Sequence, residues 1–165
     1  MSIRFNSYVG DGQRVPFERL ELATELPAPG FSGVSRIGSI VIDIDGFELI
    51  DVQLWDEIDQ HWKSLVHGVT EMLQTGVSKP CWPSQAIYLN HVRYGDPDDP
   101  WLHLQVLFDD DPIDDAQAHV NLREYVTACA AGAIEFFDRA EQLDDKLQGK
   151  FARQRELIAG WSVLL

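Results

Sequence analysis

The sequence predicts an α+β domain: an antiparallel sheet of five or six strands, two main helices packed on one face, and a short C-terminal helix. Three patterns lead to this class. Two β-branched runs surround an Asp-Gly pair at residues 39–51, and an amphipathic stripe follows at residues 55–73. Residues 86–143 then have a strand–strand–strand–helix pattern. Strands joined by short turns pair antiparallel, which favours α+β over α/β.

The 165 residues are expected to form a single domain. This length is enough for a substantial core, and a composition of 45% hydrophobic and 24% charged residues is typical of globular proteins. The N-terminal segment, residues 1–33, has a turn signal at 9–12, a short candidate strand at 17–23 and a Pro- and Gly-containing break at 27–30. We therefore expect this segment to be irregular or to supply an edge strand.

The clearest strand signal is a hairpin at residues 39–51. Residues 39–44 and 47–51 are apolar and β-branched, and Asp45 and Gly46 lie between them. Both central residues of a type I′ turn need a positive φ, which suits an Asp-Gly pair. The sequence therefore predicts two antiparallel strands joined by this turn.

A helix is predicted directly after the hairpin. Asp56, Glu57 and Asp59 lie in its first turns, where negative charge is favourable to the helix dipole, and Gly76 is placed to end it. Its apolar residues recur at spacings of three and four, as on one face of a helix. These residues are Trp55, Ile58, Trp62, Leu65, Val66, Val69, Met72 and Leu73.

The second half of the chain begins with three predicted strands. They cover residues 86–94, 101–108 and 116–120, and a turn at 95–100 separates the first two. In the second strand, alternation assigns one set of side chains to the core. This set is Leu102, Leu104, Val106 and Phe108.

The register of these strands predicts a pair of histidines. Matching the inward-facing residues places Leu104 opposite Ala118, and so places His103 opposite His119 on the outer face. Two adjacent imidazoles can bind a metal or respond to pH near their usual pKa. Since the spacing places no third ligand, two solvated histidines on an exposed sheet are the main interpretation, and no metal or cofactor is predicted.

A second main helix and an apolar tail complete the chain. Asn121 followed by Glu124 fits a capping box. Gly132 lies in the helix interior, where it costs about 1 kcal/mol relative to alanine, so we expect close packing there. Residues 149–165 form an apolar tail that is expected to be helical and to pack back on the domain. A homodimer contact through this tail is the alternative.

The charge of the chain excludes several partners. There are 13 Lys and Arg against 27 Asp and Glu, for a formal net charge of −14. Such a surface repels phosphate backbones, so nucleic-acid binding is not expected. No apolar run reaches the roughly 18 residues of a membrane helix, and residues 1–25 lack a signal-peptide pattern. A cytoplasmic protein is therefore expected.

The acidic residues are concentrated between Arg93 and Arg123, where no Lys or Arg occurs. The predicted hairpins place two acidic loops at opposite ends of strand 101–108, with aromatic and histidine side chains between them. This combination favours a protein interface and fast association with a basic partner. A solvated surface that confers solubility is the alternative. The predicted partner-binding residues are Asp96, Asp98, Asp99, Trp101, His103, Asp109, Asp110, Asp111, Asp115 and His119.

Catalytic signatures were not found in the sequence. There is no GxSxG, P-loop, HExxH or GxGxxG pattern, and Cys81 and Cys129 have no metal-ligand spacing. No catalytic residue is predicted, and the chain is not expected to be an enzyme. Two alternatives remain: a small enzyme or metal-binding module that uses His103 and His119, and a self-associating structural or regulatory subunit that uses the tail.

The segment from Phe47 to Trp62, continued by Lys63 to Leu73, resembles small bacterial α+β proteins in which a hairpin precedes a helix with spaced tryptophans. A single acidic domain of this kind is similar to the immunity proteins of polymorphic-toxin and contact-dependent inhibition systems. The resemblance covers about residues 35–143 in general character and carries no diagnostic motif. It implies a protein that neutralises a toxin domain, such as a nuclease, by occlusion and without chemistry.

Overall fold

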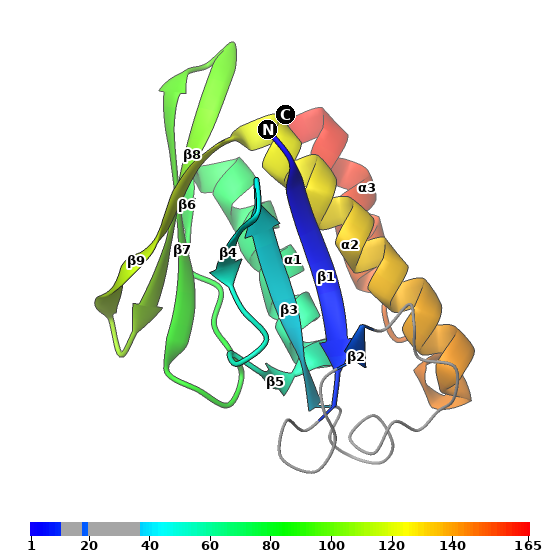
Figure 1. Cartoon of the computed structure of the whole chain (residues 1–165). Coiled ribbons are helices and arrows are strands. Elements are labelled where there is room, and N and C mark those ends of the chain that lie inside the picture. Colours follow the sequence, from blue (N-terminus) through cyan, green and yellow to red (C-terminus); the bar gives the residue numbers. More distant parts are fainter. Residues whose placement is uncertain (11–17, 20–36) are drawn as a thin grey trace.

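A computed structural model describes residues 1–10, 18–19 and 37–165 of the chain. These residues form two antiparallel sheets and three α-helices (Figure 1), which confirms the α+β class. The expected single sheet of five or six strands is corrected, because the described strands divide between a five-stranded and a four-stranded sheet. We call the five-stranded sheet the N-terminal sheet and the four-stranded sheet the C-terminal sheet.

The N-terminal sheet has the strand order β2-β1-β3-β4, and β5 also pairs with β3. Its strands are β1 (Ile3–Val9), β2 (Glu18–Arg19), β3 (Ile37–Ile44), β4 (Phe47–Ile50) and β5 (Asp56–Glu57). The predicted hairpin is confirmed: Asp45 and Gly46 join β3 to β4 with φ values of 52° and 87°. β2 lies within the candidate strand 17–23, whose other residues are outside the described part of the chain.

The N-terminal segment contains a regular strand that the sequence patterns did not predict. β1 pairs antiparallel with β3, from Ile3 opposite Ile44 to Val9 opposite Gly38. Ser7 lies at an inward position of β1 and is buried, so a polar residue interrupts the apolar alternation. Its hydroxyl accepts a hydrogen bond from the Trp62 indole N–H at 2.9 Å, which makes this burial tolerable.

Helix α1 (Ile58–Thr75) carries the predicted stripe from Ile58 to Leu73, but it begins later than predicted, because Trp55 precedes it and Asp56 and Glu57 form β5. It ends at Gly76, which has a φ of 88° and donates its N–H to the Met72 carbonyl at 2.8 Å. Asp56 precedes the helix in β5, where its buried carboxylate accepts the N–H groups of Glu57 and Ser84. Its role is therefore to hold the start of α1 against the loop that leads to β7.

The C-terminal sheet has the strand order β6-β7-β8-β9. Its turns are tighter than predicted: Gly95 pairs with Pro100 and Asp96 with Asp99, within the segment expected to be a loop. The pairing of β7 with β8 continues to the tip of the hairpin, although Asp and Pro at this end have a low propensity for strands. The strands are β6 (Val77–Ser78), β7 (Ile87–Asp96), β8 (Asp99–Phe108) and β9 (Asp111–Asn121).

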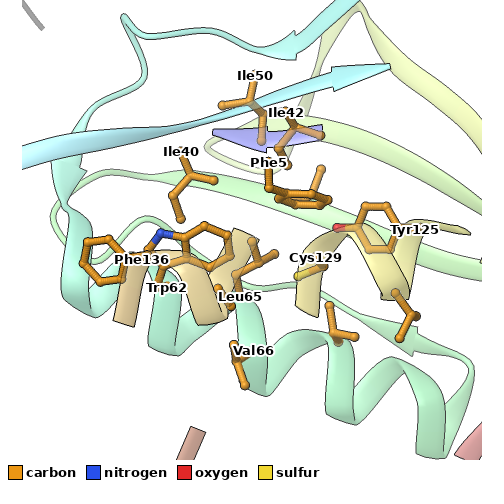
Figure 2. Close-up of a cluster of buried hydrophobic side chains, with 14 of the residues drawn as sticks. Phe5, Ile40, Ile42, Ile50, Trp62, Leu65, Val66, Tyr125, Cys129 and Phe136 are labelled. Atoms are coloured by element: carbon orange, nitrogen blue, oxygen red, sulfur yellow. The ribbon is translucent and has the colours of Figure 1, made fainter. Parts of the chain in front are cut away.

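Helix α2 (Leu122–Leu143) packs on β1 and joins both sheets to α1. The predicted cap is present, since the Asn121 side chain accepts the N–H groups of Arg123 and Glu124 at 3.0 and 3.3 Å. Close packing at Gly132 is confirmed, because a Cβ there would lie 2.6 Å from the Phe5 Cβ. Figure 2 shows part of the core between β1, β3, α1 and α2, in which Trp62 of α1 lies between Phe136 of α2 and Phe5 of β1.

The C-terminal tail packs back on the domain, as expected. A short 3₁₀ turn, η2 (Asp145–Leu147), leads to α3 (Ala152–Leu164), which lies against α1. Phe151 and Trp161 are buried, and the Trp161 indole N–H donates to the Thr70 hydroxyl at 2.9 Å. In the described part of the chain, no helix is long and apolar enough to cross a bilayer.

Candidate functional site

The predicted register of the C-terminal sheet is confirmed around His103, but the predicted inward position of Phe108 is wrong: Phe108 is exposed and Leu107 is buried, beyond a register shift between Gln105 and Leu107. Leu104 lies opposite Ala118, and His103 lies opposite His119. Leu104 points into the core, so alternation places the two histidines on the outer face of the sheet. Tyr94, opposite Trp101 in the β7–β8 ladder, is on the same face.

Four side chains from three strands form a continuous group that we call the outer-face cluster: Tyr94, Trp101, His103 and His119. The two imidazole rings are stacked, with centroids 4.6 Å apart and planes 15° apart. The Tyr94 hydroxyl is hydrogen-bonded to His119 Nδ1 at 2.8 Å, and His103 Nε2 lies 3.2 Å from the Gln117 Oε1. These contacts hold polar and aromatic side chains in fixed positions on an exposed sheet, as a binding surface requires.

The acidic tip of the β7–β8 hairpin adjoins this cluster. The Asp99 carboxylate accepts hydrogen bonds from the Asn121 amide at 3.0 Å and the Trp101 indole at 3.4 Å. Asp96 accepts the N–H of Asp98 at 2.9 Å, which shapes the turn itself. All three aspartates are exposed, so they add negative charge directly beside Trp101.

The acidic tip of the β8–β9 hairpin is at the other end of β8, roughly 30 Å away for a ten-residue strand. Asp109 and Asp110 form its turn with φ values of 51° and 71°, and Asp110 is paired with Lys79. Asp111 begins β9. A left-handed conformation is costly for residues other than Gly and Asn, although Asp tolerates it better than most.

The predicted site residues therefore occupy three places. Asp96, Asp98, Asp99, Trp101, His103 and His119 lie together along one end of the outer face. Asp109, Asp110 and Asp111 lie at the far tip, as the hairpin pattern predicted. Asp115, with a φ of 62°, is separate from both, in an irregular part of β9 where the pairing with β8 shifts register.

A buried polar chain was missed by the sequence patterns. Both ring nitrogens of His91 are hydrogen-bonded: Nδ1 lies 2.8 Å from the Ser78 hydroxyl, and Nε2 lies 2.8 Å from the Tyr125 hydroxyl. Burial lowers the pKa of His91 from 6.5 to about 3 and raises the pKa of Tyr125. Since all three side chains are buried, this chain ties β6 and β7 to α2 and presents no group to a substrate.

A second buried histidine, His61, contacts Trp82 with ring centroids 4.1 Å apart and ring planes tilted by 45°, and its Nδ1 has no hydrogen-bond partner among the described residues. Burial lowers the pKa of His61 to about 3. His67, six residues further along α1, is exposed. Within residues 1–10, 18–19 and 37–165, no group of three or more His, Cys, Asp or Glu could hold a metal ion.

A groove between the two sheets was also missed. It lies between β4, at the edge of the N-terminal sheet, and β9, at the edge of the C-terminal sheet, and has a volume of about 360 Å³. Its position depends on how two separate sheets pack, so strand patterns alone do not predict it. The lining residues are Phe47, Glu48, Leu49, Asp51, Gln53, Leu54, Val106, Ile113, Asp114, Asp115 and Ala116.

Comparison of the chain with protein-family models, curated proteins and solved structures found no match.

Proposed function

We propose that this chain is a binding protein that neutralises a basic protein partner by occlusion, in the manner of an immunity protein that blocks a toxin domain such as a nuclease. The observation that carries the proposal is the outer-face cluster with Asp99 at its border. Tyr and Trp are the residue types that anchor protein interfaces, and here Tyr94 is 42% exposed. The proposed mechanism involves no chemistry.

Charge supports a basic partner. The chain has a net charge of −14, and both hairpin tips that border the outer face carry aspartates. A field of one sign around an aromatic surface accelerates the encounter with an oppositely charged protein. The same field slows association with acidic proteins and nucleic acids, so it contributes selectivity as well as speed.

The turn at Asp109 and Asp110 adds a second argument. Asn-Gly is the favoured pair where both residues need a positive φ, whereas here both are aspartates and only Asp110 is paired with Lys79 among the described residues. The chain instead has aspartate at both positions, at a cost in local stability. Strained residues of this kind are concentrated at functional sites, which supports a role for these carboxylates in partner encounter.

The test is affinity capture from the native host at low salt, followed by association kinetics with the captured basic protein. Replacing Asp109, Asp110 and Asp111 together by Lys is expected to slow association about tenfold or more at low salt. Trp101→Ala is expected to increase the dissociation rate, because it removes an anchor and leaves the acidic tips intact.

A matched control separates a local effect from total charge. Glu71, Asp145 and Glu156 are exposed and lie on α1, η2 and α3, so replacing all three by Lys changes the net charge equally without touching the C-terminal sheet. Equal on-rates for the two triple variants would contradict the proposed surface. A capture that yields no basic protein at low salt would contradict the proposed function itself.

The stacked pair of His103 and His119 favours a second candidate, a small metal-binding module or enzyme that uses this face. Elemental analysis of the purified protein tests it. Stoichiometric zinc or nickel that is lost in His103→Ala would support this candidate over the binding protein.

A further inference from the structure

The groove between β4 and β9 combines an apolar floor with an acidic rim. Leu49 and Val106 are buried at its base, with 3% and 0% of their surface exposed. Glu48, Asp114 and Asp115 supply carboxylates around them. Neither Lys nor Arg is among the lining residues, so nothing in the described lining neutralises this charge.

The two strands that border the groove are both sheet edges. β4 pairs with β3 and β9 with β8, and each is the last strand of its ladder in the described part of the chain. An edge strand offers main-chain N–H and C=O groups to an added extended segment. Backbone pairing of this kind needs no particular sequence in the ligand, so the side chains of the groove would determine selectivity.

The shape of β9 makes its acidic residues available to the groove. The β8–β9 pairing shifts register between Gln105 and Leu107, and Asp115 has a φ of 62° in the part of β9 opposite this shift. A bulge bends an edge strand and redirects its side chains. Asp114 and Asp115 are both exposed and both line the groove, which places two adjacent carboxylates at its rim.

We propose that this groove receives an extended segment of the basic partner and seats an arginine side chain from it. An arginine has an aliphatic stem that suits the floor of Leu49 and Val106 and a guanidinium that pairs with two carboxylates at once. Lysine fits the charge but lacks the planar fork that carboxylate pairs favour. This inference rests on the proposed function, since it names a feature of the same basic partner.

The probe is a fluorescently labelled hexapeptide of alternating leucine and arginine, titrated into the full-length protein and followed by anisotropy. Its citrulline analogue has the same shape without the charge and is expected to bind at least about tenfold more weakly, and the lysine analogue to fall between them. Equal binding of the arginine and citrulline peptides would overturn the proposal.

Two matched variants locate the binding site. Combining Asp114→Asn with Asp115→Asn is expected to weaken binding of the arginine peptide about tenfold. Asparagine tolerates the left-handed conformation of residue 115, so the fold is retained. Glu71→Gln with Glu156→Gln removes the same charge on α1 and α3, away from the groove and the outer-face cluster, and is expected to change affinity less than about twofold. Equal losses in the two variants would overturn the proposal in favour of general electrostatic attraction.

The captured partner distinguishes failure of this inference from failure of the proposed function. If Trp101→Ala weakens binding of the captured partner and the variant at Asp114 and Asp115 does not, the proposed function stands and the groove proposal is overturned. If no basic protein is captured but the peptide discriminates as expected, the groove proposal is supported and the neutralising function fails.

Discussion

Gly132→Ala tests the central packing between α2 and β1. In a helix interior, replacing glycine by alanine normally stabilises a protein by about 1 kcal/mol. At this position the new Cβ would lie 2.6 Å from the Phe5 Cβ, 2.9 Å from the Phe5 carbonyl oxygen and 3.2 Å from the Trp62 ring. Phe5 belongs to β1, whose backbone is held by its pairing with β3, so the strand cannot move away without losing hydrogen bonds.

The overlap therefore outweighs the helix propensity. Overpacking of a close-packed core costs about 1–3 kcal/mol, and the contact with main-chain atoms favours the upper part of that range. We expect a net loss of about 1–2 kcal/mol, equivalent to a decrease in Tm of roughly 2–8 °C for a domain of this size. Urea unfolding followed by circular dichroism measures the change in the free energy of unfolding.

Gly160→Ala is the matched control. Gly160 lies within α3 and is exposed, and a Cβ added there would have no atom of the described residues within 4 Å. The same substitution should therefore stabilise the protein by about 0.5–1 kcal/mol. If Gly132→Ala were as stable as the unmodified chain while Gly160→Ala behaved as expected, the packing of α2 on β1 described above would be refuted.

Four further predictions concern pH, the Tyr125–His91 hydrogen bond, the acidic turn and the tail. The pKa of His91 is about 3 in the folded protein and 6.5 in the unfolded chain, so the unfolded state binds more protons between these values. The contribution of neutral His91 to stability is therefore full above pH 6.5 and is lost as the pH falls toward 3. The urea midpoint should decrease over this window, and it should decrease less steeply in His91→Gln. Tyr125→Phe leaves a His91 nitrogen unpaired and should cost about 1–3 kcal/mol in urea unfolding near neutral pH. Combining Asp109→Asn with Asp110→Gly should raise the urea midpoint while slowing association with the basic partner; an unchanged midpoint would argue against strain in this turn. Val163→Asp, at a side chain 86% exposed, should leave the elution volume in size exclusion unchanged, whereas a shift to a smaller species would establish a dimer through the tail.

Much of the local structure was predictable from the sequence. The hairpin at Asp45 and Gly46, the end of α1 at Gly76 and the cap at Asn121 each depend on residues within one turn of the chain, so short patterns determine them. The opposition of His103 and His119 was predicted by matching the inward-facing residues Leu104 and Ala118. The tight turn alone would place His103 opposite Ala116, and the register shift between Gln105 and Leu107 moves it opposite His119.

What the sequence could not determine depends on contacts between distant segments. β1 was missed because buried Ser7 interrupts its pattern, and the hydroxyl is satisfied by the indole of Trp62, 55 positions away. The same is true of His91, whose partners lie on β6 and α2, and of the groove, whose two walls belong to different sheets. Local propensity decides which elements form and which faces are apolar, whereas the pairing of separate sheets is decided by how the whole core packs around Phe5 and Trp62.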